Sequence, residues 1–209
     1  MKRLWLTILF LALGMFASAQ TQLTASQSRE VVASLTEATA SMQTLQCRFV
    51  QQKTMSMLAE PTISEGTLHY AAPDKMRWEY AKPYQFALIV NGAQTIRIKD
   101  GKTEKLDANQ AKMYKGLADL IMGSASGKKL FDTTIFDVVL FDDGEVWKAE
   151  MTPKRRDMKR MFSQLVFRFD KTMQTATQVE FIEPNGDKTL IRFLQIELNV
   201  VIDDGTFKE

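Results

Sequence analysis

Polar and apolar residues alternate with a period of two along most of the chain, which predicts a protein built mainly of β-strands. One clear strand is residues 75–80, in which Met76, Trp78 and Tyr80 point to one face and charged residues point to the other. The same pattern predicts about eleven strands. They cover residues 46–57, 62–71, 75–80, 85–91, 95–99, 103–107, 136–142, 146–152, 162–170, 175–183 and 188–199.

Short turn sequences separate many of these strands. The dipeptides Asn91-Gly92, Asp100-Gly101, Asp143-Gly144 and Asn185-Gly186 tolerate positive φ and favour tight hairpins. Strands joined by such turns are antiparallel neighbours. We therefore predict one long antiparallel meander, without internal repeats or a linker that would divide it.

Helical spacing replaces the alternation in two places. Before the strands, with Ser26 or Ser28 as N-cap, one apolar stripe comprises Val31, Leu35, Ala38, Met42 and Leu45. Between the strands, residues 108–134 lack alternation, and their helically spaced apolar residues are Met113, Leu117, Leu120 and Ile121, with a second short piece around Leu130 and Phe131. Helices before and within a strand-rich chain indicate an α+β fold.

Several strands are apolar on both faces, notably residues 86–90, 138–141 and 165–169. A sheet that is covered on one face only should alternate apolar with polar residues. Core packing explains any one of these residues. The excess over the whole sheet favours a strongly curved sheet whose concave face has more apolar lining than a few short helices can fill.

The first 19 residues have the pattern of a secretory signal peptide. Lys2 and Arg3 precede an apolar run, and Ala17-Ser18-Ala19 is a typical cleavage site. The run is short for a membrane anchor. We expect cleavage after Ala19 and one exported domain over residues 20–209.

Composition and motifs argue against several classes of function. Without Lys2 and Arg3, basic and acidic residues are equal at 25 each, which argues against nucleic acid as a partner. The lone His69 and lone Cys47 provide no metal site, and no nucleotide or hydrolase motif is present. We expect no enzyme activity, no metal and no cofactor. A glycosidase needs only two carboxylates that the fold brings together, so a hydrolase stays an open alternative.

Two further features have both a structural and a functional interpretation. The basic run at residues 154–160 is a solvated hairpin loop, or a docking patch for an anionic membrane or an acidic partner. Methionines suit surfaces that adapt to variable apolar ligands, although each alone is more typical of a core. The candidates are Met55, Met57, Met76, Met113 and Met122.

The order of several short motifs resembles one family, the periplasmic outer-membrane lipoprotein carriers, LolA. The most specific block is Pro73-Asp74-Lys75-Met76-Arg77-Trp78-Glu79-Tyr80, followed by Pro83. Weaker matching pieces are residues 49–53, 64–70, 91–92, 116–121 and 199–207. Relatives have an arginine before the proline of the main block, whereas this chain has Ala72, so either the contacts that hold the lid or the cargo cycle must differ.

The resemblance implies an unclosed antiparallel β-barrel with helices as a lid over an apolar cavity. It implies a monomeric periplasmic carrier that takes acylated lipoproteins from an inner-membrane ABC-type releasing complex to the outer membrane. The acceptor at the outer membrane is not identified by the resemblance. The alternative is a periplasmic sensor of lipid or envelope stress on the same scaffold. The implied cavity and lid residues are Phe49, Met76, Trp78, Tyr80, Phe86, Leu88, Leu117, Leu120 and Ile121.

Overall fold

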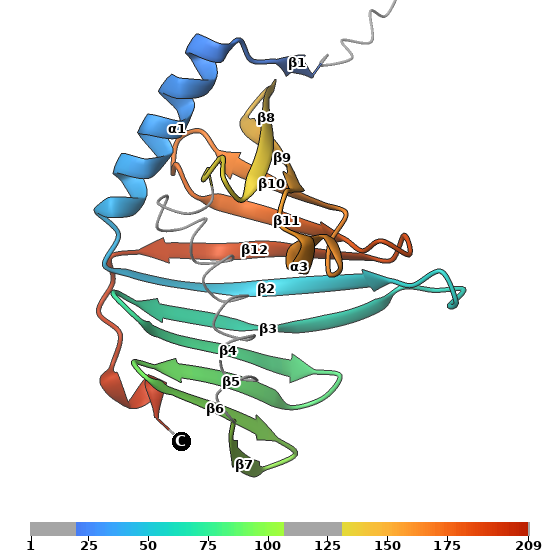
Figure 1. Cartoon of the computed structure of the whole chain (residues 1–209). Helices are drawn as coiled ribbons and strands as arrows, with labels where there is room; N and C mark the ends of the chain where they lie inside the picture. The colour runs from blue at the N-terminus through green and yellow to red at the C-terminus, as the bar shows by residue number, and fades with distance from the viewer. Residues whose placement is uncertain (1–19, 107–130, 209) are drawn as a thin grey trace, which may run out of the picture.

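The computed structural model describes residues 20–106 and 131–208. The expected signal peptide and the lid residues Leu117, Leu120 and Ile121 lie outside this part of the chain. One twisted, curved antiparallel sheet of twelve strands forms the fold (Figure 1). Its helical elements in the described part are α1 (Ala25–Ala40), the single-turn α3 (Arg156–Lys159) and the 3-10 helix η1 (Asp204–Phe207).

All the strands predicted from alternation are present, with ends within about three residues of the expected ones. The additional strand β1 (Thr21–Gln22) is too short to show a period. The others are β2 (Thr44–Thr54), β3 (Thr62–Ala71), β4 (Lys75–Lys82), β5 (Phe86–Asn91), β6 (Gln94–Lys99), β7 (Lys102–Lys105), β8 (Phe136–Asp143), β9 (Val146–Pro153), β10 (Gln164–Asp170), β11 (Ala176–Ile182) and β12 (Lys188–Leu198).

The prediction of one continuous meander was wrong. Strands β2 to β7 and strands β8 to β12 form two meanders, but β7 does not pair with β8. Instead β12 pairs with β2, so that Phe193 lies opposite Phe49, and β1 extends the other edge beside β8. The tight turns are as predicted: Gly92, Gly101, Gly144 and Gly186 all have positive φ.

Helix α1 begins one turn earlier than its apolar stripe suggests. Thr24, rather than Ser26 or Ser28, is the N-cap, and it forms a capping box with Gln27. The helix ends at Ala40, so Met42 and Leu45 are buried outside it. In Figure 1, α1 lies along the end of the sheet where β12 finishes and β2 begins, and the β2–β3 and β11–β12 hairpins extend from the opposite end. We call the latter the open end.

The two faces of the sheet have different cores. The inner face carries the main cluster of buried side chains, from Leu45 and Trp78 to Phe167, and α1 contributes Val31 and Leu35 to it. A smaller apolar group on the outer face consists of Ala87, Ile89, Ile96 and Phe207. Because η1 contacts β4 and β5 and buries Phe207 there, it covers this group.

That outer group changes the interpretation of residues 86–90. Part of their two-faced apolar character serves to hold the C-terminal segment, not to line a cavity. The segment is fixed by Arg77 Nη1, which donates to the carbonyl of Thr206 at 3.3 Å, and by an ion pair of 2.8 Å between Lys75 and Asp204.

Within the described residues, we find no helix that is both long and apolar enough to cross a membrane.

Candidate apolar binding surface

Six of the residues predicted to line a cavity lie on one face of the sheet. Phe49 on β2, and Met76, Trp78 and Tyr80 on β4, all point to the inner face. The ladder between β4 and β5 places Leu88 opposite Trp78 and Phe86 opposite Tyr80. The structure therefore brings these six side chains together. That they contact a ligand stays a prediction.

The aromatic members form a connected cluster. The ring centroids of Phe49 and Trp78 are 4.4 Å apart, and those of Phe49 and Tyr80 are 5.1 Å apart in an edge-to-face arrangement. Trp78 also meets Phe193 at 6.3 Å, and Tyr80 meets Phe86 at 6.0 Å. These separations are favourable for aromatic pairs. The rings therefore form one connected apolar cluster, most of it buried, rather than a set of isolated side chains.

Gly66 makes this cluster possible, and sequence reasoning did not single it out. It lies opposite Phe49 in the ladder between β2 and β3, beside a register shift between β3 and β4. A Cβ atom there would lie 1.9 Å from the Glu79 carbonyl oxygen and 2.6 Å from Phe49 Cζ. The ring of Phe49 thus occupies the space of the missing side chain. A glycine within a strand is the sequence signal that could have identified it.

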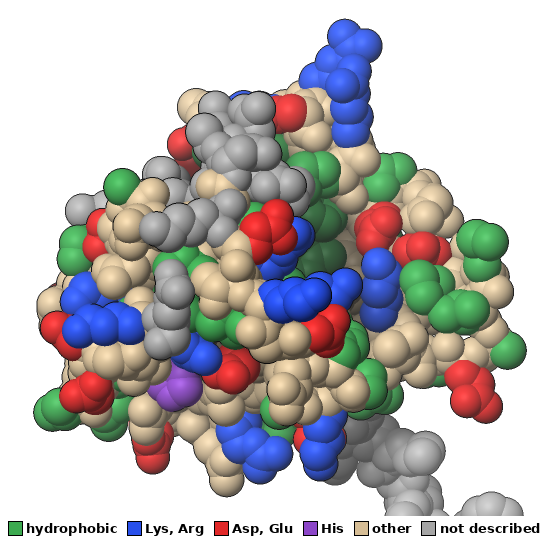
Figure 2. Space-filling model, turned by 90° about the horizontal axis from the view of Figure 1, so that it is seen from below, with side chains coloured by type: hydrophobic (Ala, Val, Ile, Leu, Met, Phe, Trp, Pro, Cys, Tyr) green, Lys and Arg blue, Asp and Glu red, His purple; other side chains and the backbone are tan. Residues whose placement is uncertain are grey.

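Exposure of the aromatic rings increases towards the open end. Phe49 is 1% exposed and Trp78 6%, whereas Tyr84, whose ring is 5.5 Å from that of Tyr80, is 47% exposed. The β2–β3 hairpin adds Met57, which is 93% exposed and so does not belong to the core. Figure 2 shows hydrophobic side chains recessed among charged ones in a view from below.

Polar groups adjoin the cluster on its open-end side. The hydroxyl of Tyr80 donates to Gln51 Oε1 at 2.8 Å. Burial raises the pKa of Tyr80 to about 12, so the phenol keeps its proton at physiological pH. Gln51 in turn lies opposite the buried Ser64.

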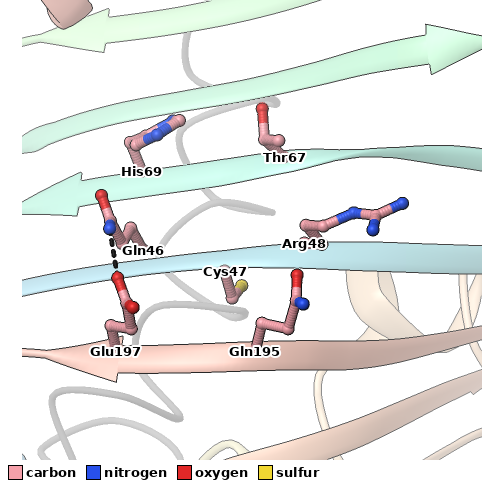
Figure 3. A pocket seen from close by; sticks show the side chains of 7 residues that line it. All are labelled: Gln46, Cys47, Arg48, Thr67, His69, Gln195 and Glu197. Carbon is pink, nitrogen blue, oxygen red and sulfur yellow. Dashed lines mark hydrogen bonds between the residues drawn. The ribbon is translucent and has the colours of Figure 1, made fainter.

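A separate hollow of about 440 Å³ lies on the outer face (Figure 3), over β2, β3 and β12. It adjoins a bulge in β12, where Gln195 has a φ of +53°. The residues that line it are Gln46, Cys47, Arg48, Thr67, His69, Gln195 and Glu197, of which Cys47 has its side chain in the inner core. Gln46 donates to Glu197, and this mixed polar lining does not suit an apolar ligand.

His69 and Thr67 share this outer face, because residues two apart on a strand point the same way. Burial lowers the pKa of His69, and the charge of Arg77 lowers it further. Cys47 is buried, and burial raises its pKa to about 12, which fits a small apolar residue rather than a reactive thiol. The described residues contain no group of three or more potential metal ligands.

The basic run occupies the loop between β9 and β10, where it forms α3. Two of its charges have acidic partners: Lys154 pairs with Asp137 at 2.8 Å, and Arg155 pairs with Asp157 at 2.6 Å. The loop is also anchored, because Phe162 stacks near Phe181 with centroids 5.2 Å apart. A docking role for this loop stays a prediction.

Comparisons with known proteins agree on one family. Residues 40–209 match the family described as "Outer membrane lipoprotein carrier protein LolA". An outer-membrane lipoprotein carrier protein of Dechloromonas aromatica is 30% identical over 171 residues, which cover 79% of this chain and 76% of that protein.

Solved structures support the fold. A Thermus thermophilus protein of uncharacterized function matches 88% of this chain and 94% of its own, with a TM-score of 0.53 and 9% identity. A chain of the MucA/MucB complex of Pseudomonas aeruginosa matches 88% of this chain with a TM-score of 0.52 and 12% identity. This chain spans 61% of that one.

Proposed function

The chain belongs to the LolA family of outer membrane lipoprotein carrier proteins, and from this membership we propose that it carries acylated lipoproteins across the periplasm. The aromatic cluster on the inner face is the observation that supports the proposal, because its rings form one connected apolar group, from the buried Phe49 and Trp78 to the 47% exposed Tyr84, which acyl chains would reach from the open end. In this proposal an inner-membrane ABC-type releasing complex supplies the cargo, and the outer membrane receives it.

The energetics of transfer require such a carrier. One acyl chain loses on the order of 10 kcal/mol when it moves from a membrane into water, at about 0.8 kcal/mol per methylene. An apolar surface that replaces the membrane removes most of this cost. Release remains feasible if the carrier re-covers its own apolar surface as the cargo leaves.

Photocrosslinking from the inner face tests this function directly. A photoreactive residue at position 78 or 88 should crosslink to lipoprotein acyl chains in living cells. The matched control is position 67, because Thr67 lies on the neighbouring strand but on the outer face. Crosslinks from position 67 with none from 78 or 88 would contradict the proposal.

A sensor of lipid or of misassembled envelope proteins is the second candidate. The fold likeness to a chain of the MucA/MucB complex favours keeping it, although that likeness concerns the fold alone. Purification from the native periplasm, followed by mass spectrometry, separates the two functions. Mature lipoproteins among the co-purified molecules support a carrier, and a transmembrane regulator in their place supports a sensor.

A further inference from the structure

Along β2 and β3 the inner face changes from apolar to polar towards the open end, whereas β12 keeps the buried Ile191 opposite Gln51. On β2 the inward residues proceed from Cys47 and Phe49 to Gln51 and Lys53. The ladder places Ser64 of β3 opposite Gln51 and Thr62 opposite Lys53. On these two strands the apolar surface therefore has a boundary, which lies between the aromatic cluster and the open end.

Gln51 is a half-buried residue at this boundary whose amide N–H groups have no acceptor among the described residues. Its Oε1 accepts the hydrogen bond from Tyr80, and this contact fixes the orientation of the amide. No described residue accepts a hydrogen bond from its Nε2, which carries two N–H donors. The side chain is half-buried, on the same strand face as Phe49.

The cargo chemistry complements this arrangement. Acyl chains are joined to the polar part of a lipid anchor through ester or amide carbonyls, which accept hydrogen bonds. A carbonyl that leaves water without gaining a donor loses a hydrogen bond and weakens binding. A donor at the apolar boundary would prevent that loss while the methylenes lie against the aromatic rings.

We propose that Gln51, positioned by Tyr80, donates a hydrogen bond to an acyl-ester carbonyl of the bound lipid anchor. This inference rests on the proposed carrier function. It also gives the cargo a direction: its chains run from Gln51 towards Phe49 and Trp78, and its polar part leaves through the open end, away from α1.

Two synthetic probes test the hydrogen bond. One is a lipopeptide whose two palmitoyl chains are ester-linked to a glyceryl-cysteine, and the other carries two ether-linked hexadecyl chains on the same peptide. Binding to the mature chain is measured by displacement of a fluorescent lipid. Wild-type protein should bind the ester probe about fivefold to tenfold more tightly than the ether probe, the range expected for one hydrogen bond.

Gln51→Leu should remove this preference by lowering the affinity for the ester probe alone. Gln52→Leu is the matched control, because Gln52 is the next residue on β2 and faces outward. It should change the affinity for neither probe. Tyr80→Phe, which frees the amide to rotate, should reduce the preference by a smaller factor, and thermal unfolding checks that each variant is folded.

The outcomes separate the two proposals. If Gln51→Leu loses the same affinity for both probes, or keeps the preference for the ester probe, the proposed role of Gln51 is wrong, but the carrier function is unaffected. A wild-type protein that binds neither probe overturns the carrier function and this inference with it.

Discussion

Replacing Gly66 by alanine should destabilise the protein strongly, because two rigid groups occupy the space of the new methyl. The Cβ would lie 1.9 Å from the Glu79 carbonyl oxygen and 2.6 Å from Phe49 Cζ, whereas ordinary van der Waals contacts begin at about 3.5 Å. Overpacking costs about 1–3 kcal/mol. Since β3 and β4 must also separate locally, we expect about 3 kcal/mol, or a melting temperature lower by about 6–12 °C for a domain of this size.

Equilibrium urea unfolding, followed by the fluorescence of Trp78 and Trp147, measures this loss. Gly186→Ala is the control: its Cβ would have nothing within 4 Å, but its φ of +88° is unfavourable for alanine. Backbone strain alone should cost about 1 kcal/mol there. If Gly66→Ala has the urea midpoint of the wild type, or loses less than Gly186→Ala, the steric reasoning is wrong.

Three further results are expected. Phe207→Ala should lower the free energy of unfolding by about 3 kcal/mol in the same assay, because Phe207 is 1% exposed over β5. A loss below about 1 kcal/mol would show that η1 contributes little to stability. The pKa of Tyr80 is about 12 in the folded protein and 10 in the unfolded chain, so its contribution to stability is complete below pH 10 and is lost as the pH rises towards 12. The free energy of unfolding of Tyr80→Phe should therefore decline less steeply than that of the wild type between pH 10 and pH 12. Cys47, with a pKa of about 12, should react with iodoacetamide at pH 8 only after unfolding, and rapid alkylation of the native protein would contradict its burial.

Local patterns determined the strands, but the order of the strands depends on distant contacts. The tight turn at Asn91-Gly92 pairs β5 with β6 because its short length leaves no other geometry. No such turn joins β12 to β2, and their pairing is visible only once the chain has folded. Alternation specifies which face a residue occupies and does not specify the neighbouring strand.

The candidate site shows the same division. The inward direction of Trp78 and Tyr80 follows from period two, and the structure agrees. Gly66 was missed because its role depends on having no side chain, which leaves space for the ring of Phe49. The two-faced apolar character of residues 86–90 was counted towards an excess of apolar lining. For Ile89, the reason is instead contact with the segment of Phe207, more than a hundred residues away in the sequence.

The position of β12 has a consequence for how the molecule is assembled. The ladder between β12 and β2 lies at the middle of the sheet, yet its partners are the last and the first long strands to be synthesised. Each half can form hairpins from local contacts, but the halves can join only after β12 has been synthesised. Pairings of such long sequence separation form slowly. A chain interrupted before residue 188 would therefore leave one edge of β2 unpaired, although its other edge pairs with β3, and that edge could associate with other unfinished copies.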